Sequence, residues 1–210
     1  MNSSSAPLPP SSSSTLALIL ASTSKYRKEL LERLEIPFEC IPPRADEEAL
    51  KRAWSDEKPS PQNLAERLAV AKAESLCNEC PAAWIIGSDQ LVDLDGEILG
   101  KRADFESACA QLEKLSGRTH RLVTAVALAK RGETTLIFSD ITTLEFLKLS
   151  RAEIERYVAC EKPYDCAGTY KIEGLGIRLL KRLETHDPTA IIGLPLIRLS
   201  QELGLRGWTL

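Results

Sequence analysis

The chain has 210 residues, of which 43% are hydrophobic and 27% are charged, and its formal net charge is −3. These values are typical of a globular protein with a sizeable core and exclude a wholly disordered chain. There is no overall basic field for nucleic acid, and no apolar run approaches the ~18 residues of a membrane span. We therefore expect neither nucleic acid nor a membrane as a partner.

The first 14 residues, Met1–Ser14, are rich in serine and proline. This composition predicts a disordered tail, followed by a single domain over residues 15–210. Among the six cysteines, Cys77 and Cys80 have metal-binding spacing, but neither a second pair nor a nearby histidine completes a zinc site. We therefore expect reduced thiols and a cytoplasmic location.

A short apolar run, Thr15–Ala21, predicts a strand that leads directly into a helix. The hydroxyls of residues 22–24 are good caps for that helix, whose apolar positions are Tyr26, Leu30, Leu31 and Leu34. Its first turn carries three cations, at Lys25, Arg27 and Lys28. The helix dipole favours anions at this end, so a hydroxyl-rich turn, free N–H groups and cations together predict a phosphate site. The alternative is a helix that merely begins with surface cations.

A second strand is predicted over Ile36–Pro43, followed by an acidic loop or helix start that contains Glu47. Acids at a helix start are common caps, so Glu47 by itself indicates structure rather than chemistry. A long helix is predicted over Pro59–Glu79, with Lys72 at a position of its apolar stripe. The ammonium of Lys72 either extends along the helix to water or points into a cleft, and the pattern leaves both open.

A β-hairpin is predicted around Asp95 and Gly96, because the favoured two-residue turn needs positive φ at both positions. Regular pairing would place Gln90 opposite Lys101. The buried strand before the turn has a polar interruption that includes Asp89, and buried charge is rare unless it is used. The hairpin thus indicates a site with an acid, an amide and a lysine, or else a solvated hairpin mouth. A site shared by Asp89 and Lys101 would require a bulge, since ideal pairing points them to opposite faces.

The rest of the chain predicts helices and strands on both sides of a glycine-spaced segment, Cys166–Gly176, whose glycines indicate close approach of the backbone to another group. Helices are expected over Asp104–Ser116, Ser150–Cys160 and from about Gly193 to Leu203. Strands are expected over Arg121–Lys130, Thr134–Phe146 and Ile177–Arg182.

Four separated motifs resemble those of the Maf family of nucleoside triphosphate pyrophosphatases. They are LASTSKYRKELL at 20–31, Asp46-Glu47, IGSDQ at 86–90 with LGK at 99–101, and IGLPL at 192–196. The resemblance implies an α/β (α+β) fold, in which helices flank an elongated mixed β-sheet and two lobes enclose an active-site cleft. It also implies cleavage between the α and β phosphates, a divalent cation (Mg²⁺ or Mn²⁺), and often a homodimer.

The resemblance implies roles for particular residues. Asp89 corresponds to the catalytic proton acceptor, and Glu47 and Asp89 would hold the metal. Four cations would bind the triphosphate: Arg27, Lys28, Lys72 and Lys101. Substrate choice would depend on Tyr26, Gln90 and Glu173, the pattern of the branch that acts on 7-methyl-GTP in the removal of modified nucleotides. The cationic base of that nucleotide favours an aromatic face and a nearby carboxylate.

The chain departs from that branch at four positions, where the branch usually has Pro, Trp, Arg and Pro: Lys25, Tyr26, Lys28 and Arg102. A tyrosine still offers a π face to a base. Two alternatives stay open: a nucleotide-binding regulator of cell division that needs no hydrolysis, and a pyrophosphatase for dTTP and UTP. The second is disfavoured by Gln90, where that branch has Thr.

Overall fold

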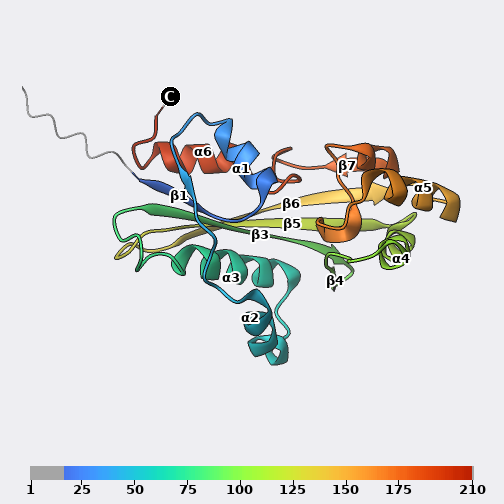
Figure 1. The fold of residues 1–210 in the computed structure, drawn as a ribbon, viewed down its shortest axis with the longest axis horizontal. Helices are drawn as coiled ribbons and strands as arrows, with labels where there is room; N and C mark the ends of the chain where they lie inside the picture. The colour runs from blue at the N-terminus through green and yellow to red at the C-terminus, as the bar shows by residue number, and fades with distance from the viewer. Residues whose placement is uncertain (1–16, 210) are drawn as a thin grey trace, which may run out of the picture.

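The computed structural model describes residues 17–209, so the predicted tail Met1–Ser14 lies outside the described residues. These residues form one mixed seven-stranded sheet in the order β2-β1-β3-β5-β6-β7, with β4 paired to β3 (Figure 1). The strands are β1 (Leu18–Ala21), β2 (Glu39–Cys40), β3 (Trp84–Leu94), β4 (Glu97–Leu99), β5 (Thr119–Ala129), β6 (Leu136–Phe146) and β7 (Leu180–Glu184). Only the pairs β1–β2 and β1–β3 are parallel.

Six α-helices flank this sheet in the described part of the chain: α1 (Lys25–Glu32), α2 (Glu47–Ala53), α3 (Pro61–Glu74), α4 (Phe105–Leu115), α5 (Arg151–Glu161) and α6 (Leu196–Gly204). In Figure 1, α1 and α6 cover one face at one end of the elongated sheet, α3 covers the opposite face, and α4 and α5 lie at the other end. The expected fold, an elongated mixed sheet flanked by helices, is confirmed. No helix within residues 17–209 combines the length and apolar character needed to cross a membrane.

The buried side chains form three clusters, and each cluster lies between the sheet and one of the groups of helices described above. The alternation of β5 explains two of them: Val123 and Ala125 pack against α3, whereas Val126 and Leu128 pack toward α1 and α6. The third cluster joins the far ends of β3, β5 and β6 to α4 and α5. Each end of the sheet therefore has its own core, and the long central strands connect them.

The predicted hairpin is present. Asp95 and Gly96 both have positive φ, 53° and 90°, and Val92 pairs with Leu99 in the expected register. The pairing stops at Leu99, so the predicted pair of Gln90 with Lys101 does not form. Residues 88–90 do not interrupt the strand either, because β5 pairs with β3 throughout this stretch.

On its other edge, β3 has an unpaired stretch. Its pairing with β1 ends at Gly87, and its pairing with β4 begins only at Val92. Both faces of the sheet are therefore accessible from one side over residues 88–91. No bulge is needed to bring side chains of opposite faces together, and the expectation of one was wrong.

Three element boundaries differ from prediction. The strand expected over Ile36–Pro43 is reduced to β2, since the prolines around it cannot donate to a ladder. The helix expected to reach Glu79 ends at Glu74, where the Ser75 hydroxyl donates to the carbonyl of Lys72 at 2.7 Å. The strand expected from Ile177 begins at Leu180, because residues 175–179 form a 3₁₀-helix.

Candidate active site

A cavity of about 1070 Å³ lies along the unpaired edge of β3. Its walls come from the β1–α1 turn, α2, α3, the residues after β4, the segment 165–173 and the turn at 191–192. Segments from the two ends of the sheet therefore meet there. All but one of the residues predicted for the site line this cavity: Tyr26, Arg27, Glu47, Lys72, Asp89, Gln90, Lys101 and Glu173. The exception is Lys28.

Lys72 points into the cavity, so the cleft alternative for this lysine is the one that the structure shows. Its Nζ lies 2.7 Å from Asp89 Oδ1 and 3.0 Å from Glu47 Oε1, and it donates to the Ser88 carbonyl at 3.4 Å. The residue is only 5% exposed. A buried ammonium needs such partners to remain charged.

Close packing of α3 on β3 places this lysine. Gly87 lies under α3, where an added Cβ would stand 2.2 Å from the Ala69 carbonyl oxygen and 2.6 Å from the Ala73 nitrogen. Only glycine permits this approach. Lys72, one residue before Ala73, is thereby held above Asp89, two residues after Gly87 on the same face of the strand.

Asp89 is 6% exposed and carries an unsatisfied oxygen. Oδ1 accepts from Lys72, but Oδ2 has no hydrogen-bond partner among residues 17–209. A buried carboxylate oxygen without a partner is costly, and such atoms occur where a ligand or a reacting group is to be bound. Oδ2 is the atom of this site best placed to act on a bound molecule.

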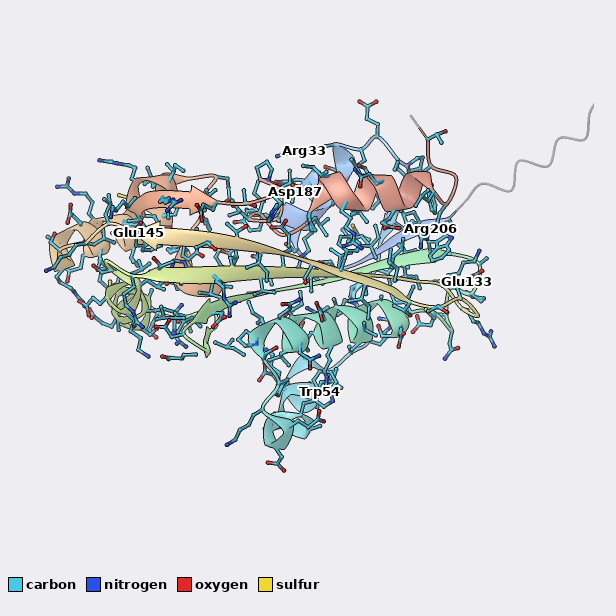
Figure 2. All side chains as sticks on the ribbon, turned by 180° about the vertical axis from the view of Figure 1, so that it is seen from behind. Arg33, Trp54, Glu133, Glu145, Asp187 and Arg206 are labelled. Atoms are coloured by element: carbon cyan, nitrogen blue, oxygen red, sulfur yellow. The ribbon has the colours of Figure 1, made fainter. Side chains whose placement is uncertain are left out.

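Glu47 is the first residue of α2, which Asp46 caps by accepting from the Ala49 amide at 3.0 Å. Burial alone would raise the pKa of Glu47, but the charge and hydrogen bond of Lys72, together with the charges of Lys51 and Arg27, outweigh it and lower that pKa. Glu47 is thus both a helix-start residue and an ionised member of the site. Helix α2 projects away from the sheet beyond α3, and Figure 2 shows Trp54 at its end. The guanidinium carbon of Arg67, in α3, lies 5.3 Å from the centroid of the Trp54 ring.

The carboxylates of Glu47 and Asp89 suit a divalent cation. No group of three or more His, Cys, Asp or Glu in residues 17–209 is arranged to hold a metal. Mg²⁺, however, is commonly held by one or two carboxylates together with substrate phosphates. Two carboxylates, one with a free buried oxygen, therefore fit such an ion in the presence of a polyphosphate.

Arg27 extends the cationic side of the site from the first turn of α1. Its Nε donates to the Gly193 carbonyl at 3.2 Å, and Ser88 Oγ donates to the same oxygen at 3.1 Å. Burial lowers the pKa of Arg27, while Asp89 and Glu47 oppose this shift. The IGLPL motif is thereby attached to both the helix start and the central strand.

The structure places Lys28 outside the cavity. Its side chain is exposed and lies 3.7 Å from Glu32, one turn further along α1. The preceding positions of the same turn, Tyr26 and Arg27, line the cavity, whereas Lys28 does not. The cavity is lined instead by Lys25 and by Lys51, the second of which the sequence reasoning missed. The available signal was its position four residues after Glu47 on a helix.

The residues predicted to select the substrate lie together in the cavity wall. Gln90 Nε2 donates to Thr124 Oγ1, to the Ala190 carbonyl and to the Ile191 carbonyl, all within 3.0 Å. Its amide nitrogen is therefore used by the protein, and its oxygen is left to accept from a ligand. Tyr26 has Lys25 Nζ 4.9 Å from its ring centroid.

Residues 17–205 match the model of the family described as Maf-like protein. The chain belongs to the Maf family. A 7-methyl-GTP pyrophosphatase of Xanthomonas campestris pv. campestris (strain 8004) is 46% identical over 92% of this chain and 97% of that protein. A 7-methyl-GTP pyrophosphatase of Bdellovibrio bacteriovorus is 47% identical over 89% of this chain and 95% of that protein. Among solved structures, a HAM1 protein from Coxiella burnetii has a TM-score of 0.49 at 16% identity, over 90% of this chain and 98% of that one.

Proposed function

We propose that this Maf protein is a nucleoside triphosphate pyrophosphatase, with 7-methyl-GTP as its preferred substrate and the removal of modified nucleotides as its purpose. The observation that carries the proposal is the buried group of Lys72, Asp89 and Glu47 in a cavity with further cations. The names of relatives that are 46–47% identical over most of both chains support the choice of substrate.

In the proposed reaction, Asp89 is the general base. Its free Oδ2 takes a proton from a water molecule whose oxygen attacks the α-phosphorus. A new α-phosphorus–oxygen bond forms as the bond to the bridging oxygen breaks, and pyrophosphate leaves with the bonding electron pair. Lys72 fixes the carboxylate through Oδ1, which leaves Oδ2 as the oxygen without a protein partner.

The cations offset the charge that develops on the phosphates. Arg27 and Lys101 are proposed to bind the triphosphate together with Lys72, and Lys25 and Lys51 join them because both line the cavity. Lys28, which lies outside, is left out of this set. Mg²⁺ or Mn²⁺, held by Glu47 and Asp89, would supply further charge compensation when bound.

The base would lie against Tyr26, with the Gln90 oxygen accepting from its N–H groups and the exposed carboxylate of Glu173 near its positive charge. A cation gains from both an aromatic face and a carboxylate, whereas a neutral pyrimidine gains less from either. This difference favours 7-methyl-GTP over dTTP or UTP.

Incubation of the protein with nucleotides and Mg²⁺ or Mn²⁺ tests the reaction. We expect release of monophosphate and pyrophosphate, loss of turnover on chelation with EDTA, and recovery when the metal is returned. Release of orthophosphate would refute the bond assignment. Competition among 7-methyl-GTP, dTTP and UTP tests the preference, and faster turnover of a pyrimidine nucleotide would overturn it.

Asp89→Asn keeps the volume and the contact with Lys72 but removes the base. Turnover is expected to fall at least about a hundredfold while nucleotide binding persists. Asp56→Asn, at an exposed acid beyond α2, is the matched control and should behave as wild type. Near-normal activity of Asp89→Asn would refute the base. A protein that binds nucleotide without any turnover would instead favour a regulatory role, as in cell division.

A homodimer and a cytoplasmic location are further parts of the proposal. All six cysteines lie within the described residues and are free thiols, in keeping with a reducing compartment. Sedimentation at micromolar concentration and cell fractionation test the two points. A monomer, or recovery in another compartment, would refute the respective point.

A further inference from the structure

A polar contact joins α1 to the segment that follows α5 in the lining of the cavity. Tyr26, in the first turn of α1, donates its hydroxyl hydrogen to Asp165 Oδ2 at 3.3 Å, although the two residues are 139 positions apart. Both line the cavity. Asp165 lies between α5 and the 3₁₀-helix Ala167–Thr169. The contact therefore joins two segments of the cavity lining that are distant in sequence, and one of its partners is the residue against which the base is proposed to lie.

Lys171 anchors this contact. Its Nζ lies 3.2 Å from Asp165 Oδ1, and its side chain is 14% exposed, against 53% for Asp165. Its backbone is held on both sides, because its N–H donates to Tyr157 Oη at 3.0 Å and its carbonyl accepts from the amides of Gly174 and Gly176. The glycine spacing of this segment thus has a structural cause.

The charges along this chain of contacts are consistent with a fixed arrangement. Burial alone would raise the pKa of Asp165, but the hydrogen bond and charge of Lys171, together with hydrogen bonds from the backbone and Cys166, outweigh it and lower that pKa. Burial would lower the pKa of Lys171, yet Tyr26 and Asp165 raise it. Lys171 is therefore held as a cation, Asp165 as an anion, and the Tyr26 hydroxyl is the donor at the end of the chain.

Asp165 differs in this respect from Glu173, the other carboxylate of this wall. Glu173 is exposed and forms no ion pair among the described residues, so its charge is available to a ligand. The charge of Asp165 is already compensated by Lys171. The two carboxylates should then affect the substrate in different ways.

We propose that Asp165, held by Lys171, is a positioning residue that fixes the Tyr26 ring in the orientation against which the substrate base stacks. Without the contact, the ring of a residue in the first turn of a helix is free to rotate between staggered positions. A ring fixed before binding loses no rotational freedom when the base arrives, which favours affinity. This inference rests on the proposed function, since it concerns the base of a nucleotide.

The test is a double-mutant cycle of Asp165→Ala and Tyr26→Phe, because alanine removes the acceptor and phenylalanine removes the donor. Each single variant is expected to raise KM for 7-methyl-GTP about two- to tenfold, as for the loss of one hydrogen bond, with kcat changed less than about twofold. When Tyr26→Phe is already present, adding Asp165→Ala should have no further effect, because the donor is already gone. Asp56→Asn serves as the control with unchanged KM.

Two readouts separate positioning from a general structural effect and from charge recognition. Inhibition by inorganic tripolyphosphate, which has no base, should be the same in wild type and Asp165→Ala. The ratio of kcat/KM for 7-methyl-GTP to that for GTP should be unchanged by Asp165→Ala but lowered by Glu173→Gln. A matching loss of tripolyphosphate inhibition, a lowered ratio for Asp165→Ala, or full additivity in the cycle would each overturn the proposal.

Failure of the proposed function can be recognised separately. If the wild type turns over no nucleotide, the same cycle is measured as binding of 7-methyl-GTP by calorimetry. If each single variant lowers the affinity about two- to tenfold and the double variant lowers it no further, the positioning role is supported in a protein that only binds. Additive losses of affinity in the double variant, or no loss in either single variant, would overturn the role.

Discussion

Lys72→Met removes the buried ammonium that pairs with both Asp89 and Glu47. The side chains of Lys72 and Asp89 are 6% and 9% exposed, and removal of one partner of a buried pair costs about 3–5 kcal/mol. The cavity admits water on one side, so we expect a loss of about 3 kcal/mol in the free energy of unfolding at pH 7. In a chain of this length, that lowers Tm by about 6–12 °C.

Thermal unfolding followed by circular dichroism at pH 7 measures this loss. Lys114→Met is the matched control. Lys114 forms a 2.6 Å ion pair with Glu97 in which both side chains are about half exposed, so its loss should change the free energy of unfolding by less than about 1 kcal/mol. The double variant Lys72→Met/Asp89→Leu removes both charges and should recover most of the stability. A Tm of Lys72→Met equal to that of wild type would refute the reasoning.

The loss of stability in Lys72→Met is also expected to depend on pH. Because Lys72 lowers the pKa of Glu47 despite its burial, Glu47 contributes stability that is present above its ordinary pKa of 4.5 and is lost as the pH falls through the lowered value. Lys72→Met lacks that contribution at every pH. The difference in stability between wild type and variant should therefore become smaller below pH 4.5, and a difference that grew with acidity would contradict this assignment.

Three further predictions concern packing, titration and substrate choice. Gly87→Ala should lose about 1–3 kcal/mol in urea unfolding, since its Cβ would displace α3, whereas Gly204→Ala, with no atom within 4 Å of the added Cβ, should not. Burial lowers the pKa of His120 to about 4 from 6.5, so wild type should lose up to about 3 kcal/mol more than His120→Leu as the pH falls from 6.5 to 4. Lys25→Met should raise the kcat/KM ratio of 7-methyl-GTP to GTP about two- to fivefold, because Lys25 competes with a cationic base for the Tyr26 ring.

Each of these has an outcome that contradicts it. Equal unfolding midpoints for the two glycine variants would mean that α3 is not held against β3 at Gly87. Parallel stability curves of wild type and His120→Leu would mean that His120 is not buried as a neutral group. In the third experiment, phosphate contacts of Lys25 cancel in the ratio, so an unchanged ratio would show that its position over the ring is irrelevant to the base.

Local patterns predicted most of the secondary structure. Of the hydroxyls expected to cap the helix after the first strand, Ser24 does so by accepting from the Arg27 amide. The Asp-Gly turn also forms in the expected register. These features depend on residues a few positions apart, so the sequence contains all the information that determines them.

Features that depend on distant segments could not be predicted in this way. The end of β4 at Leu99 and the end of β1 opposite Gly87 together leave the edge of β3 open, and no local pattern indicates that gap. The contact between Tyr26 and Asp165 likewise needs two walls of a cavity to be known. Lys28 was assigned to the phosphates from its neighbours in sequence, and no local pattern separates it from Tyr26 and Arg27, which line the cavity.

The open edge of β3 has a consequence for how such a protein can diverge. Asp89 points toward α3, and Gln90, the next residue, points toward the turn at 190–191, yet both reach one cavity. A substitution at Gln90 would alter contacts with that turn and leave the Lys72–Asp89 pair untouched. The proposed base and the proposed determinant of nucleotide choice thus occupy adjacent positions on opposite faces of one strand, so a lineage could exchange its substrate without first losing its reaction.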